Sequence, residues 1–132
     1  MRLVLDTNVI ISALLFDGLP EHLLLSTLGG SHEIVLSSYI IAETTRILEE
    51  RFKVQPANIK LLQQLLNECE VVYFEPFLNV VADEPDNRIL ETGIKGNADY
   101  LVTGDKLLLK LKEYKSLKII SVRDCVKMLE LN

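Results

Sequence analysis

The sequence predicts an α/β protein whose mostly parallel β-sheet is covered by helices on both faces. Short apolar runs alternate with longer segments of helical spacing along all 132 residues, as in successive βαβ units. Apolar runs such as residues 3–5 and 101–102 indicate strands that are buried on both sides. We therefore expect one domain over residues 1–132, built as a three-layer α/β/α sandwich with a twisted, Rossmann-like sheet.

Five short runs rich in Val, Ile, Leu and Tyr predict the strands. In chain order they are residues 2–5, 33–36, 71–74, 100–103 and 117–121. Clusters of Gly, Pro, Asn, Asp and Ser punctuate the chain between apolar segments, as expected where it turns.

Seven longer segments predict the helices. They cover residues 7–16, 20–28, 38–52, 56–68, 86–95, 106–113 and 122–131. Ile40, Thr44 and Leu48, for example, repeat at helical spacing and share one face. Pro56 suits the first turn of a helix, and Gly96 suits a helix end.

The charge of the chain is unevenly distributed. The formal net charge is −5, with residues 1–105 at −9 and residues 106–132 at +4. Overall acidity disfavours a nucleic-acid binder that relies on bulk positive charge, although a bound cation reverses the sign locally. The basic residues near the end either flank an RNA backbone or keep the surface soluble. They are Lys106, Lys110, Lys112, Lys115, Lys118, Arg123 and Lys127.

Several classes of protein are disfavoured by what the sequence lacks. The apolar uncharged stretch of residues 7–16 is too short to span a bilayer, and the first residues lack the pattern of a signal peptide. We therefore expect a cytoplasmic protein that does not contact membranes. Cys69 and Cys125 lie far apart without a CxxC motif, which disfavours a structural zinc site. Glycine-rich phosphate loops and a nucleophile elbow are also absent.

Acidic residues stand at the ends of the predicted strands. Asp6 directly follows the first strand, and Asp105 follows the fourth after one glycine. Glu43, about one turn into the helix after the second strand, and Asp86, which opens the fifth helix, can reach the same edge. In a parallel α/β sheet the functional site lies outside the carboxyl ends of the strands. The four acids therefore mark the candidate site.

Four carboxylates at one edge repel each other. At a separation of about 4 Å and an effective dielectric near 20, each pair costs about 4 kcal/mol. Extra protons or a cation must offset this repulsion. Oxygen ligands without His or Cys favour Mg²⁺ or Mn²⁺, and such an ion can activate water and neutralise charge on a phosphodiester.

Each acid also has a simpler structural role open to it. Asp6 and Asp105 stand where the N-cap residue of the following helix is expected. Glu43 and Asp86 lie early in helices, where a negative charge complements the helix dipole. Asp99 either joins the acids or merely starts a strand. Spacing alone does not decide between these roles.

The chain resembles the PIN-domain ribonucleases in three stretches that occur in the order found in that family. The stretches are Leu3-Val4-Leu5-Asp6-Thr7-Asn8-Val9-Ile10, then Ser38-Tyr39-Ile40-Ile41-Ala42-Glu43, then Asp86-Asn87-Arg88-Ile89-Leu90-Glu91 with Ala98-Asp99-Tyr100-Leu101-Val102-Thr103-Gly104-Asp105. Together they span nearly the whole chain. The resemblance is greatest to small stand-alone bacterial and archaeal members described as toxins of toxin–antitoxin pairs.

This resemblance implies a PIN-like fold and an endoribonuclease that depends on Mg²⁺ or Mn²⁺ and leaves a 5′-phosphate and a 3′-hydroxyl. It also implies an RNA substrate, a small antitoxin as partner and a homodimer. The residues that it assigns to the site are the metal-binding and catalytic acids Asp6, Glu43, Asp86 and Asp105, the polar groups Asn8, Ser38 and Thr103 that would orient them, and Asp99 as an additional acid.

Two other classes of function remain open. One is a non-catalytic PIN-like module that binds metal, RNA or protein, since no basic cradle surrounds the acids. The other is a receiver-like phospho-acceptor domain, which would be labelled covalently at Asp6 but is expected to carry a second acid beside it. Cleavage of RNA in the presence of Mn²⁺ distinguishes the enzyme from both.

Overall fold

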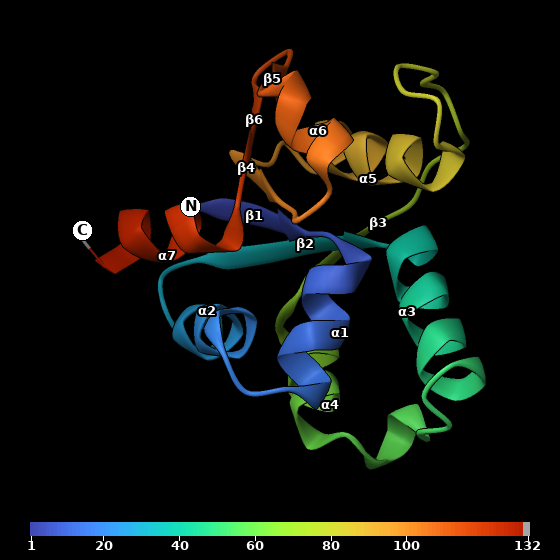
Figure 1. Ribbon diagram of the computed structural model, residues 1–132, viewed down its shortest axis with the longest axis vertical. Coiled ribbons are helices and arrows are strands. Elements are labelled where there is room, and N and C mark those ends of the chain that lie inside the picture. The colour runs from blue at the N-terminus through green and yellow to red at the C-terminus, as the bar shows by residue number, and fades with distance from the viewer. Residues whose placement is uncertain (131–132) are drawn as a thin grey trace.

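The computed structural model describes residues 1–130, which form a six-stranded sheet between layers of helices (Figure 1). The strands are β1 (Arg2–Leu5), β2 (Glu33–Ser37), β3 (Glu70–Val72), β4 (Tyr100–Val102), β5 (Glu113–Tyr114) and β6 (Leu117–Ile120). Their order across the sheet is β3-β2-β1-β4-β6-β5, and every neighbouring pair is parallel except β5 and β6. The predicted α/β class with a mostly parallel sheet is confirmed.

Figure 1 shows α5 and α6 above the sheet and α1, α2 and α4 below it. The helices are α1 (Thr7–Leu15), α2 (Leu19–Thr27), α3 (Ser38–Glu50), η1 (Pro56–Asn58, a 3₁₀ turn), α4 (Lys60–Glu68), α5 (Glu84–Lys95), α6 (Lys106–Leu111) and α7 (Val122–Glu130). α3 packs against both α1 and α5, so it joins the two helical layers at one side, and α7 packs against α2. Leu131, the last residue of the seventh predicted helix, lies outside the described residues.

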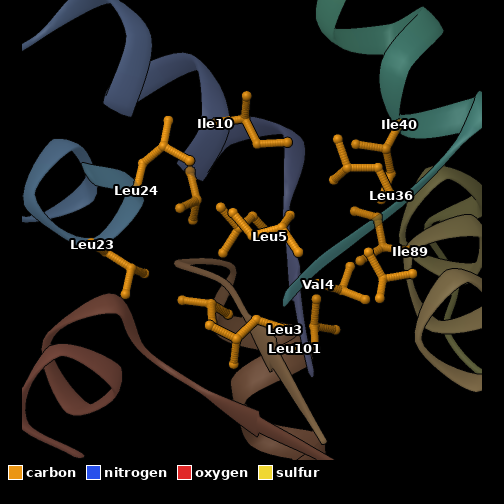
Figure 2. Packing of buried hydrophobic residues seen from close by; sticks show 14 of the residues in the cluster. Leu3, Val4, Leu5, Ile10, Leu23, Leu24, Leu36, Ile40, Ile89 and Leu101 are labelled. Atoms are coloured by element: carbon orange, nitrogen blue, oxygen red, sulfur yellow. The ribbon is translucent and has the colours of Figure 1, made fainter. Parts of the chain in front are cut away.

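Alternate residues of the central strand face different helical layers. In Figure 2, Leu5 points towards Ile10 of α1 and Leu24 of α2, whereas Val4 points towards Ile89 of α5. All five side chains are buried. Successive residues of a strand point to opposite faces, so two covered faces require the continuous apolar run that the sequence contains.

The order of the strands reverses at β1. From β1 the chain adds β2 and β3 on one side of the sheet, and β4 and β6 on the other. Leu5 pairs with Val102, so the residues that follow β1 and β4 meet at one edge, and the Asp6 N–H donates to the Val102 carbonyl at 3.0 Å. Ligands of open α/β sheets bind at such a switch point, outside the carboxyl ends of the strands.

The prediction of a single helix at residues 56–68 is wrong. Ile59 is extended, with φ −94° and ψ 103°, and it separates η1 from α4. This conformation allows the Ile59 side chain to pack against the core. α4 buries Leu62 and Leu65, so these two leucines belong to the core.

The helix predicted at residues 106–113 is too long, and the sequence did not predict β5. α6 ends at Leu111 because Lys112 adopts a left-handed conformation with φ 63°. The chain then forms the β5–β6 hairpin, in which Lys115 is also left-handed, with φ 55°. Turns of this kind normally carry Gly or Asn, so lysines at both positions conceal the hairpin in the sequence.

The helices of residues 1–130 include none that is long and apolar enough, by itself, to cross a membrane. α1 and α2 pass the length and composition test only when they are taken together, and they are bent by 96° relative to each other. Five residues of α1 are buried in the interior of the fold: Thr7, Val9, Ile10, Ile11 and Ala13.

Gly96 marks a close approach between the end of α5 and β2. A Cβ at this position would lie 2.4 Å from Cγ1 of Val35, which is fully buried and β-branched and therefore cannot easily move aside. We expect Gly96→Ala to lower the free energy of unfolding by about 1–3 kcal/mol in urea denaturation. Gly104→Ala is the control, because no atom lies within 4 Å of its Cβ position. An unchanged midpoint for Gly96→Ala would show that this contact is not tight.

Candidate active site at the carboxyl edge of the sheet

The structure brings together the four acids that the sequence predicts for the site. Asp6 follows β1 and caps α1, and Asp105 follows β4 and caps α6. Glu43 lies in the second turn of α3 and Asp86 in the first turn of α5. Asp6 interacts electrostatically with Asp105 and Glu43, and Asp86 interacts with the other three. The topology therefore concentrates negative charge at the switch point.

Asp6 is a buried carboxylate that is held from two sides. It is only 4% exposed. Its Oδ1 accepts the backbone N–H of Asn8 at 3.0 Å, and its Oδ2 accepts the hydroxyl of Thr103 at 2.6 Å. Burial raises the pKa of Asp6, the charges of Asp105 and Glu43 add to the rise, and the two hydrogen bonds only partly oppose it.

The Thr103 hydroxyl connects two of the acids. It donates to Asp6 and accepts the backbone N–H of Asp105 at 3.0 Å. Asp105 in turn caps α6, since its Oδ1 accepts the N–H groups of Leu107 and Leu108 at 2.9 and 3.0 Å. Both contacts use the same carboxylate oxygen. Capping and membership of the acidic group therefore coexist in Asp105.

Asp86 is the acid whose charge is least compensated. It is 8% exposed, and its Oδ2 is buried without a hydrogen-bond partner within residues 1–130. Burial, and then the charges of Asp105, Asp83, Asp6 and Glu43, raise the pKa of Asp86 to about 7. An ionised Asp86 is thus costly at neutral pH unless a cation is present.

α5 begins earlier than the sequence predicts. Its first residue is Glu84, and Asp83 is the N-cap, with Oδ1 accepting the Asp86 N–H at 3.3 Å. Pro85 fits the first turn, where a backbone N–H has no helical acceptor. Asp86 therefore does not open the helix, and Asp83 is a further acid beside it.

The candidate metal ligands at this edge of the sheet suit a hard divalent cation by their chemistry. They are carboxylate oxygens only, and Asp86 supplies a buried oxygen that lacks a partner. Two of the four acids have raised pKa values partly because the others are negative. In their present positions, no three His, Cys, Asp or Glu side chains of residues 1–130 form a ready ligand shell. Binding an ion would therefore draw the carboxylates together.

The polar residues predicted to orient these acids differ in their surroundings. Thr103 is fully buried and contacts Asp6, whereas Asn8 and Ser38 are exposed at the starts of α1 and α3. It is the backbone of Asn8 that donates to Asp6. The structure therefore places only Thr103 as a side chain hydrogen-bonded to an acid of the site.

Ser37 occupies the buried position next to Ser38. Its Oγ caps α3 by accepting the Ile40 N–H at 3.3 Å, and it also accepts the Thr92 hydroxyl at 2.8 Å. This contact ties α3 to α5, the two helices that carry Glu43 and Asp86. The sequence does not distinguish the two serines, because either one could precede the helix.

Asp99 lies at the other edge of the sheet. It precedes β4, whereas Asp105 follows that strand, and its Oδ2 accepts the backbone N–H of Arg2 at 2.8 Å. The residue is exposed. The structure does not bring Asp99 to the four acids, and its contact fits the simpler role at the start of a strand.

Two buried polar residues of α5 hold the irregular segment of residues 73–83. Asn87 accepts the Val81 N–H at 3.1 Å and donates to the Val81 carbonyl at 2.9 Å. Glu91, which is fully buried, accepts the Leu78 N–H at 2.7 Å. The sequence motifs give neither residue a role, although polar side chains four apart on a buried helix face are a signal for such anchoring.

The chain is similar to known proteins in sequence and in fold. A family model described as PIN domain matches residues 2–107. Among solved structures, the chain is similar to one in VapBC2 from Rickettsia felis bound to a DNA fragment from their promoter, with a TM-score of 0.65 and 21% identity over 92% of this chain and 98% of that one. This likeness shows the fold alone. The chain has no significant match among curated proteins. From the extent of the family match, the chain belongs to the PIN domain family.

Proposed function

We propose that the protein is an endoribonuclease that depends on Mg²⁺ or Mn²⁺ and acts as the toxin of a toxin–antitoxin pair. PIN domains are generally nucleases, which hydrolyse phosphodiester bonds. The observation that carries the proposal is the group of Asp6, Glu43, Asp86 and Asp105 at the switch point, with the pKa of Asp86 raised to about 7. A cation is the partner that such a group lacks.

The chain's own residues would bind and orient this cation. When bound, a divalent ion supplies positive charge that activates water and offsets the charge developing on the phosphate. The Thr103 hydroxyl fixes Oδ2 of Asp6, and the cap of α6 fixes Asp105, so both carboxylates are oriented in advance. Asp86, with its unpartnered Oδ2, gains the most from a nearby cation.

The basic residues that follow Asp105 support a nucleic-acid substrate. All seven are exposed: Lys106, Lys110, Lys112, Lys115, Lys118, Arg123 and Lys127. Two of them lie on α6, the helix that Asp105 caps. A phosphate backbone that reaches the acids can therefore contact the positive charge of Lys106 and Lys110, whereas Lys118 pairs with the start of β4, at the opposite edge from the acids.

The toxin assignment brings with it a small antitoxin as partner and a cytoplasmic location, where RNA is accessible. Membership of the PIN family and the likeness in fold to a chain of the VapBC2 complex support this part of the proposal. The homodimer implied by the resemblance stays a prediction.

Asp105→Asn separates the two roles of Asp105. The amide oxygen can still accept the Leu107 and Leu108 N–H groups, so α6 keeps its cap while the negative charge is lost. We expect the wild-type protein to cleave an unstructured RNA internally with Mn²⁺, and EDTA to stop cleavage. The variant should lose roughly 10²–10³-fold in kcat, measured on end-labelled RNA.

Asp99→Asn is the matched control, because Asp99 lies at the other edge and an amide oxygen can still accept the Arg2 N–H. It should cleave like the wild-type protein. Cleavage that persists in EDTA, or in Asp105→Asn, would contradict the metal-dependent mechanism. Mn²⁺ binding without cleavage of any RNA would favour the non-catalytic module instead.

Asp86 makes the stability of the metal-free protein depend on pH. Its pKa of about 7 in the folded state lies above the unfolded value of 3.8, so folding takes up a proton between these values. The protonated carboxyl therefore stabilises the folded state fully below pH 3.8. This stabilisation is lost as the pH rises from 3.8 to about 7, above which the folded state carries the charged carboxylate. We expect Asp86→Asn to be more stable than the wild-type protein near pH 8, by up to about 4 kcal/mol, and equally stable near pH 4.

Urea denaturation in EDTA at several pH values measures this difference. Asp17→Asn, in an exposed loop, is the control and should match the wild-type protein at every pH. Mn²⁺ near pH 8 should stabilise the wild-type protein more than Asp86→Asn. If Asp86→Asn were less stable than the wild-type protein near pH 8, the charge of Asp86 would not destabilise the folded state.

A further inference from the structure

A cleft of about 300 Å³ opens beside the four acids. Its lining includes Thr7, Tyr39, Ile40, Glu43 and Ile89. Thr7 directly follows Asp6, and Glu43 is one of the four acids, so the cleft continues from the site itself. We call it the Tyr39 cleft. Metal binding by the carboxylates does not account for its apolar walls.

The ring of Tyr39 contacts Phe74, which in turn contacts a third aromatic ring, that of Phe77. The Tyr39 centroid lies 5.3 Å from that of Phe74, and Phe74 lies 5.8 Å from Phe77 in an edge-to-face contact. Nζ of Lys95 lies 5.2 Å from the Phe77 ring. Phe74 and Phe77 belong to the segment that α5 anchors by hydrogen bonds. Tyr39 is therefore held in place at the wall of the cleft, which lowers the entropy lost when a ligand stacks on it.

The charges around the Tyr39 cleft disfavour a phosphate inside it. Glu43 and Glu84 line it. Arg88 also lines it, but its guanidinium is already paired with Glu84 at 3.4 Å and with Glu91, and it donates to the Leu78 carbonyl at 3.2 Å. A neutral, flat ring with N–H groups fits better, because apolar walls cover its faces and carboxylates accept from its edge.

The hydroxyl of Thr7 is an independent sign of a polar ligand. Thr7 is 2% exposed and lines the cleft, and its Oγ1 is buried without a hydrogen-bond partner in the described part of the chain. A buried hydroxyl without a partner is costly, and a ligand with a donor or an acceptor on its edge removes that cost.

We propose that the Tyr39 cleft takes one unpaired nucleobase of the RNA, stacked on the ring of Tyr39, next to the phosphate that the acids act on. The edge of the base forms a hydrogen bond with the Thr7 hydroxyl, which is buried in the empty cleft and turns towards the base when it enters. RNA as the ligand rests on the proposed function, whereas the aromatic wall and the unpartnered hydroxyl stand on the structure alone. The arrangement makes the protein favour single-stranded RNA, because a paired base must first break its pair and its stacking contacts to enter the cleft, whereas an unpaired base does not.

Binding without metal tests this inference separately from cleavage. The probe is a fluorescein-labelled, unstructured RNA decamer in EDTA, compared with the same decamer in a perfect duplex. We expect Tyr39→Ala to weaken binding of the single strand about 5- to 100-fold and to leave duplex binding unchanged. Tyr39→Phe keeps the ring and should bind within about twofold of the wild-type protein. Tyr73→Ala, an exposed tyrosine outside the cleft lining, is the matched control.

In Mn²⁺, Tyr39→Ala should raise KM for the single strand by a similar factor and change kcat little. Equal binding by the wild-type protein and Tyr39→Ala overturns the inference, as does equal weakening on single strand and duplex, or a wild-type protein that binds no single strand. Single-strand binding that depends on Tyr39 without any cleavage would support the cleft and contradict the proposed nuclease. Failure of the cleft and failure of the enzyme are therefore distinguishable.

Discussion

The gathering of four carboxylates at one edge of the sheet is the constraint on which the rest of the site depends. The strand order places β1 beside β4, so the chain must leave the sheet at Asp6 and at Thr103–Asp105 side by side. Helices α3 and α5 add Glu43 and Asp86 to the same region. Burial and mutual repulsion then raise the pKa of Asp6 and Asp86. A fold that keeps this arrangement bears its electrostatic cost whenever no cation is bound.

The acids also help to build the fold that gathers them. Asp6 caps α1, and Asp105 caps α6, in each case through Oδ1. In Asp6, Oδ2 is directed to Thr103, so one carboxylate serves both the helix and the site. Capping and ligand binding are therefore not alternatives for these residues, and substitutions that remove charge while keeping an acceptor oxygen are the ones that separate the two effects.

Local patterns in the sequence predict what depends on local physics. The buried strand at residues 2–5 and the acids that end β1 and β4 are visible because two covered faces require apolar runs, and because helix starts select acids. The β5–β6 hairpin is hidden, since lysines occupy the left-handed positions at the end of α6 (Lys112) and in the hairpin turn (Lys115). Asn87 and Glu91 are equally hidden, because their partners are backbone groups of an irregular segment. Asp99 precedes β4, whereas Asp105 follows it, so the direction of that strand places the two acids at opposite edges of the sheet.

The most direct test of the account is a crystal structure of the protein with Mn²⁺, read by anomalous scattering. We expect a peak among the carboxylates of Asp6, Glu43, Asp86 and Asp105, with Oδ2 of Asp86 turned towards it. A peak at another place, or an empty edge at a Mn²⁺ concentration that supports cleavage, would contradict the claim that these four acids form the metal site of this PIN domain.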